Sequence, residues 1–113
     1  MSAALIHVRF DRVGFHRWPD APAHRKYLRE RHRHLFKVEV TTAVKNDERE
    51  IEYHDLMEVS RISLDRVLGL PEACAWSCER MARELGAQLK ASYKRDFTVE
   101  VWEDGECGST VST

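Results

Sequence analysis

The chain has 113 residues, of which 42% are hydrophobic and 33% are charged, and its formal net charge is −1. This length predicts a single domain over residues 1–113, because a second hydrophobic core would not fit. No apolar run approaches the ~18 residues of a membrane span, and the first residues lack a signal-peptide pattern, so we expect no contact with a membrane. The three cysteines, Cys74, Cys78 and Cys107, match no zinc-knuckle spacing and predict reduced thiols in a cytoplasmic protein.

Positive charge is concentrated in the first third of the chain. Residues 1–37 carry nine Lys or Arg and three Asp or Glu, a net charge of +6, whereas the remaining residues carry −7. This asymmetry predicts an anionic partner for the first third. The partner is a phosphorylated small molecule, a nucleic acid or the acidic remainder of the chain itself.

The first half of the sequence predicts strands. Residues 4–13 alternate apolar and polar side chains, and residues 14–23, with two prolines, predict a loop. The basic residues 24–33 suggest no more than one helical turn. Residues 34–44 give the clearest strand, with Phe36, Val38, Val40 and Val44 on one face. After a turn at 46–49, residues 50–53 predict a short return strand that completes a hairpin.

The second half predicts helices and a closing strand. Residues 55–66 suggest a short helix, which Gly69-Leu70-Pro71 ends. Residues 72–91 place apolar side chains at three- and four-residue steps, a pattern typical of a helix packed on a sheet. Residues 97–102 alternate again as a last strand, and Cys107 lies in a tail too short to assign. The order predicts an α+β domain with two helices on one face of an antiparallel sheet.

Three of the six histidines form a candidate metal site. His32 and His34 are two residues apart at the start of a predicted strand, so both imidazoles point to the same face. His16 follows the first strand, and pairing of the two strands would bring it close. Neutral imidazole is a preferred zinc donor, and three protein ligands with one open position are typical of catalytic zinc. On spacing alone, a solvated or anion-binding basic surface explains the same residues.

Several short motifs, in a fixed order, resemble the 6-pyruvoyltetrahydropterin synthase / 6-carboxytetrahydropterin synthase family. They are His16-Arg17-Trp18-Pro19, His32-Arg33-His34 before Lys37-Val38-Glu39-Val40, Glu52-Tyr53-His54-Asp55-Leu56, Leu64-Asp65-Arg66, Ser77-Cys78-Glu79 and Val99-Glu100-Val101-Trp102-Glu103. The resemblance covers about residues 10–107. It implies the tunnelling fold (T-fold), whose subunits assemble into trimers and usually hexamers with sites between subunits.

The resemblance also implies a function and a set of site residues. The function is a zinc-dependent lyase acting on 7,8-dihydroneopterin triphosphate or a related pterin, in folate, biopterin or queuosine-type biosynthesis. Zn²⁺, held by His16, His32 and His34, would act as a Lewis acid on the substrate hydroxyls. Glu103 would accept paired hydrogen bonds from the pterin ring. Two further residues, Ser77 and Cys78, would line the same pocket.

The proton-transfer residues of the family are only partly present. Leu28 lies near the place of the family's catalytic cysteine, and Arg66 replaces the histidine of a Leu-Asp-His motif, which leaves Asp65. Glu30 could act as a general base near zinc, or it is a surface carboxylate among arginines. His54 could replace the proton shuttle if it faces the pocket, or it caps the first helix.

Two alternatives to the enzyme stay open. The missing cysteine and histidine are compatible with a non-catalytic homologue that binds zinc and a pterin or deazaguanine. A nucleic-acid-binding module built on residues 24–37 is the other. The near-neutral total charge and the lack of an RNA-binding motif disfavour it.

Overall fold

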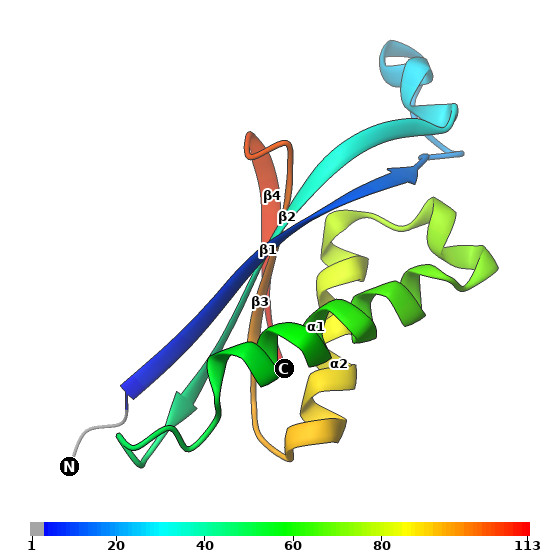
Figure 1. Cartoon of the computed structure of the whole chain (residues 1–113). Coiled ribbons are helices and arrows are strands. Elements are labelled where there is room, and N and C mark those ends of the chain that lie inside the picture. The colour runs from blue at the N-terminus through cyan, green and yellow to red at the C-terminus, as the bar shows by residue number, and fades with distance from the viewer. Residues whose placement is uncertain (1–3) are drawn as a thin grey trace.

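Four antiparallel strands in the order β1-β2-β3-β4 form the sheet of the computed structural model, which describes residues 4–113 (Figure 1). The strands are β1 (Ala4–His16), β2 (His32–Val44), β3 (Thr98–Glu103) and β4 (Cys107–Ser112). The helices are α1 (Tyr53–Leu68) and α2 (Cys78–Tyr93), with the 3-10 segments η1 (Ala23–Arg29) and η2 (Pro71–Ala75). The predicted α+β class with an antiparallel sheet is confirmed.

Strands β1 and β2 pair along their whole length, from Ala4 opposite Val44 to His16 opposite His32. Alternate side chains on each strand are buried, as a half-covered sheet requires. On β2 the predicted face is correct, since Phe36, Val38 and Val40 are at most 2% exposed.

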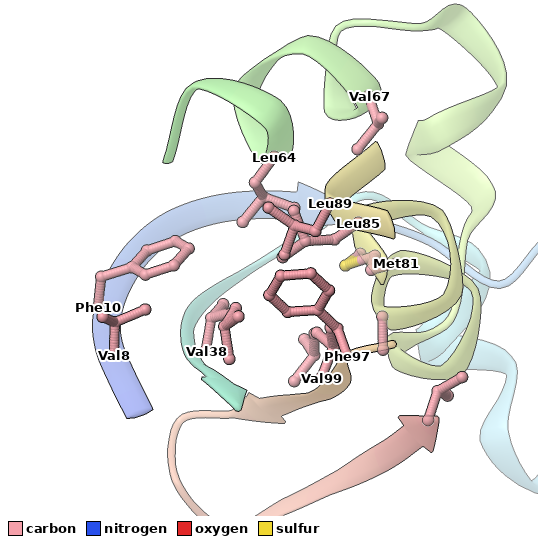
Figure 2. Packing of buried hydrophobic residues seen from close by; sticks show 14 of the residues in the cluster. Val8, Phe10, Val38, Leu64, Val67, Met81, Leu85, Leu89, Phe97 and Val99 are labelled. Atoms are coloured by element: carbon pink, nitrogen blue, oxygen red, sulfur yellow. The ribbon is translucent and has the colours of Figure 1, made fainter. Parts of the chain in front are cut away.

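Both α-helices lie on that buried face of the sheet (Figure 1). Helix α1 begins after Glu52, whose carboxylate accepts from the backbone N–H of His54, and α2 begins after Ser77, whose hydroxyl accepts from that of Arg80. Figure 2 shows their apolar side chains meeting those of the strands, with Phe97 in the middle of the cluster. The opposite face of the sheet has no helix on it among residues 4–113.

Two predicted elements in the middle of the chain are wrong. Residues 50–53 form no return strand, because Ile51 turns into the core and Glu52 already caps α1. The predicted helix over 72–91 is two elements, since Trp76 and Ser77 adopt extended backbone between η2 and α2. Ser77 is a good N-cap, and this local preference starts the helix later than the apolar periodicity indicates.

The predicted end of the first strand and the unassigned tail also differ from the structure. β1 continues through Gly14 to His16, a region predicted as loop, because β2 pairs with it that far. The tail after residue 102 forms β4, which pairs back onto β3 through a turn at Asp104-Gly105. Only Val111 of β4 is buried, so the strand lacks the apolar alternation that marks a strand in sequence. No helix among residues 4–113 combines the length and apolar character needed to cross a membrane.

Leu85 lies in the centre of the α2 contact with the sheet and has no exposed surface. We expect Leu85→Ala to lower the free energy of unfolding by about 2–5 kcal/mol, because it leaves a cavity in a packed core. Ile62→Ala is the control, since Ile62 on α1 is 49% exposed; its effect should stay within about 0.5 kcal/mol. Urea denaturation measures both, and equal effects would contradict this packing.

Candidate metal centre

Each of the three histidines, His16, His32 and His34, offers one ring nitrogen, and the three atoms lie within 4.8 Å of one another. The ring centroids are 4.6 to 5.0 Å apart. His16 is buried and the other two are partly buried. The three histidines are close enough to bind a metal ion together.

The sheet register produces this arrangement. His16 is paired with His32 across β1 and β2, and His34 follows two residues later on the same face. On β3, Glu103 is opposite Phe36, which places its carboxylate at the same end of that face. The core and the histidines therefore share one face of the sheet, with the histidines at the end where β1 stops and β2 begins.

Each imidazole is held through its Nδ1 atom. His16 Nδ1 lies 2.9 Å from the Trp76 carbonyl oxygen, and His32 Nδ1 lies 2.9 Å from the Glu30 carbonyl oxygen. His34 Nδ1 lies 2.7 Å from Asp104 Oδ2. Because all three partners are acceptors, Nδ1 carries the ring proton in each case. The Nε2 atoms then carry the lone pairs that a cation would bind, the second-sphere arrangement typical of histidine metal ligands. Glu103 Oε2 lies 3.0 Å from Nε2 of His16 and 3.5 Å from Nε2 of His34.

The interruption between η2 and α2 supplies one of these acceptors. Trp76 has extended backbone (φ −81°, ψ 141°), so its carbonyl lies outside both helices and reaches His16. The Arg17 N–H donates to the Cys74 carbonyl oxygen at 2.8 Å and ties β1 to the same segment. A single helix over 72–91 would have used the Trp76 carbonyl internally.

Asp104 supplies another acceptor and was missed by the sequence analysis. It has a positive φ of 55° in the turn before Gly105. Its Oδ1 accepts from the Leu35 N–H at 2.8 Å, while Oδ2 accepts from His34. The Asp104-Gly105 pair directly after a predicted strand was the available signal, since Asp-Gly is a strong hairpin turn sequence.

Phe36 forms the floor of the cluster. Its ring lies edge-on to His16 at 5.4 Å and tilted to His34 at 5.7 Å. Gly14 makes room for this ring, because a Cβ there would lie 2.7 Å from Phe36 Cε2. Gly14, which lies in the stretch predicted as a loop, is therefore a close-packing position inside a strand.

Burial and neighbouring groups shift the pKa values of His16 and Asp104. Burial lowers the pKa of His16, against the opposing effects of the Trp76 carbonyl and the Glu103 carboxylate. A lowered pKa favours the neutral imidazole, which is the metal-binding form. The hydrogen bond from His34 holds the pKa of Asp104 below its ordinary value, so this carboxylate stays an acceptor.

A pocket of about 540 Å³ opens beside the histidines. Residues from several elements line it: His16, Arg17, Trp18, Leu28, His32, Ala75, Trp76, Ser77, Cys78, Glu79, Glu103, Cys107, Gly108 and Ser109. The predicted pocket residues Ser77, Cys78 and Glu103 are all among them. Burial is the main reason that the pKa of Cys78 rises to about 12, so its thiol is protonated at neutral pH.

The three predicted proton-transfer residues do not line this pocket. Asp65 is bound by Arg12 at 2.7 Å, with its side chain 65% exposed. Glu30 contributes its backbone carbonyl to His32 and is exposed. His54 is 94% exposed in the first turn of α1, where Glu52 rather than His54 is the cap.

No protein-family model and no curated protein matches the chain. The resemblance to pterin synthases rests on the sequence motifs.

We expect Asp104→Asn to weaken zinc binding by about 10- to 100-fold, the usual effect of losing a second-sphere partner. Asn suits the turn, but its single oxygen cannot replace both carboxylate contacts, to the Leu35 N–H and to His34. Glu106→Gln, in the same turn, is the control. Zinc affinity is measured by competition with a chromophoric chelator, and equal affinity in both variants would contradict the assigned role.

Proposed function

We propose that this chain is a zinc-dependent lyase of the 6-pyruvoyl/6-carboxytetrahydropterin synthase type, acting on 7,8-dihydroneopterin triphosphate or a related pterin. The observation that carries the proposal is the convergence of three Nδ1-anchored histidines beside a pocket of about 540 Å³. Pockets of this size accept ligands as large as a pterin. The motif order in the sequence supplies the substrate class.

The donor set fits zinc. Three imidazole nitrogens with fixed tautomers are a frequent catalytic zinc arrangement, in which a further position accepts water or substrate. Bound zinc would polarise a substrate hydroxyl and lower its pKa. The protein's own contribution is to fix the tautomers of the imidazoles, to favour the neutral form of His16 by burial, and to present the pocket beside them.

The pocket walls suit a flat, partly polar ring. Trp18 and Leu28 line the pocket together with Ser77 and Cys78, which lie at the start of α2. Glu103 has a carboxylate that can accept two parallel N–H donors of the kind a pterin presents. Arg17 adds a positive charge to the pocket wall, which suits a phosphorylated substrate.

The position of Asp65, Glu30 and His54 favours a second candidate, a zinc- and pterin- or deazaguanine-binding homologue without turnover. None of them lines the pocket of one chain. Turnover would require proton-transfer groups from a neighbouring chain, as the family's intersubunit sites imply, or from the thiols of the pocket. Binding without turnover requires neither.

The test has two stages. Untagged protein should contain about one zinc per chain, and the His32→Ala/His34→Ala variant should contain none, because it loses two of three ligands. The zinc-loaded protein should then consume 7,8-dihydroneopterin triphosphate, and chromatography measures the loss of this substrate. Tight pterin binding without consumption would select the binding homologue, and absence of zinc from both proteins would reject both functions.

We also propose that the chain assembles into a trimer or hexamer. The radius of gyration is 15.2 Å, against about 13 Å for a compact domain of this length. The outer edge of β1 is unpaired among residues 4–113, and Leu5, Val13 and Phe15 are exposed on the face without helices. Long unpaired edges and uncovered apolar faces are usually covered by another chain.

Light scattering should give a trimeric or hexameric mass for the wild-type protein. Val13→Lys should lower that mass by placing a charge on the uncovered face, which costs free energy when the face is buried. Ile62→Lys, at an exposed apolar position on α1, should leave the mass unchanged. A monomeric wild-type protein would contradict assembly.

A further inference from the structure

Two neighbouring polar groups of the pocket wall, the carboxylate of Glu103 and the thiol of Cys107, come from the two strands of the β3–β4 hairpin. The two residues are paired at the end of the hairpin next to its turn, so their side chains lie on the same face of the sheet. Cys107 Sγ lies 3.7 Å from Glu103 Oε1, and both residues line the pocket of about 540 Å³. The thiol therefore lies beside Oε1, whereas Oε2 is the oxygen that approaches the histidines.

Cys107 is the side chain on this face of β4 that remains available to a ligand. Val111 on the same face is buried in the core, and the Ser109 hydroxyl donates to Glu79 Oε1 at 2.6 Å. Cys107 is exposed, and among residues 4–113 its thiol makes one hydrogen bond, the contact with Glu103. A thiol is a weak donor and this contact is long, so a bound ligand can replace it.

The two groups differ in their hydrogen-bonding character. Desolvation, followed by the negative charge of Glu103, raises the pKa of the Cys107 thiol, so the thiol is protonated at neutral pH. A protonated thiol donates a hydrogen bond, whereas an ionised carboxylate only accepts. The pair therefore presents an acceptor next to a donor, which complements a ligand edge with N–H groups next to a carbonyl oxygen.

Pterins and deazaguanines have such an edge. In both ring systems an amino group and a ring N–H are followed by a carbonyl oxygen, so the order along the edge is donor, donor, acceptor. Glu103 can accept from the two donors, and Cys107 beside it can donate to the carbonyl oxygen. A site that hydrogen-bonds each group of an edge disfavours a ligand that lacks one of them.

We propose that Cys107 is a specificity-determining residue of the pocket, whose thiol donates a hydrogen bond to the carbonyl oxygen of the ring edge that Glu103 binds. This inference rests on the proposed binding of a pterin or deazaguanine, and it does not require turnover. It selects rings with this carbonyl oxygen over analogues in which the oxygen is replaced. The open metal position and the carboxylate of Glu103 both remain available to the ligand.

The test measures the affinity of the zinc-loaded full chain for pterin and for 4-thiopterin, which keeps the N–H pair but has sulfur in place of the carbonyl oxygen. Sulfur is the weaker acceptor, so the wild type should prefer pterin. Cys107→Ala should lower the affinity for pterin about 2- to 10-fold, the net effect of one hydrogen bond, and should reduce the preference. Cys107→Ser keeps a donor and should retain both. Cys74→Ala is the control, because Cys74 does not line the pocket.

A second measurement reports the thiol directly. The infrared S–H stretching band should shift when pterin is added to the wild type and to Cys74→Ala, and this shift should be missing in Cys107→Ser. Wild-type affinity and preference in Cys107→Ala, with no shift of the band, would overturn the role of Cys107 while leaving the proposed function intact. Failure of the wild-type chain to bind pterin would reject both.

Discussion

Full-length pairing of β1 with β2 is the constraint on which the site depends. Side chains alternate between the faces of a strand, so a slip of one residue would move His16 to the uncovered face, away from His32. Apolar pairs such as Val8 with Val40 and Phe10 with Val38 hold the register, because they are buried only in this alignment. The packing that stabilises the fold thus also fixes the geometry of the histidines.

The covered face of the sheet changes character along its length. In its middle it carries the aliphatic core under α1 and α2, and at one end it carries imidazoles over Phe36. Partly buried polar rings need hydrogen-bond partners, and here the partners are carbonyl and carboxylate oxygens that fix each tautomer. At this end of the sheet, the oxygens that satisfy the partly buried imidazoles also fix the tautomers that a metal site would need. The break before Ser77 supplies the Trp76 carbonyl for His16, and the turn at Asp104 supplies a carboxylate for His34.

Two neighbouring residues at the end of β3, Glu103 and Asp104, contact the histidines in different ways. Asp104 holds His34 from behind, through the nitrogen that does not face the centre, whereas Glu103 faces the centre itself. The hairpin turn after β3 makes this possible, because Asp104 leaves the strand alternation at a positive φ. The hydrogen bond that holds His34 and the proposed binding of a pterin both depend on this one segment. Turnover would depend in addition on proton-transfer groups, and the three predicted ones, Asp65, Glu30 and His54, do not line the pocket.

The sequence by itself determined the α+β class, the two long strands and the grouping of the histidines, because period-two alternation sets the face of every side chain on a strand. It did not determine β4, where only Val111 is buried, or the break at Trp76, where a local cap overrides the apolar period. The partners of the histidines were also invisible, since two of them are backbone carbonyls and the third, Asp104, is 70 residues from His34. A backbone carbonyl gives no signal in the sequence even when, like that of Glu30, it is close along the chain. The contacts of His16 with Trp76 and of His34 with Asp104 join distant segments, and only the tertiary structure decides them.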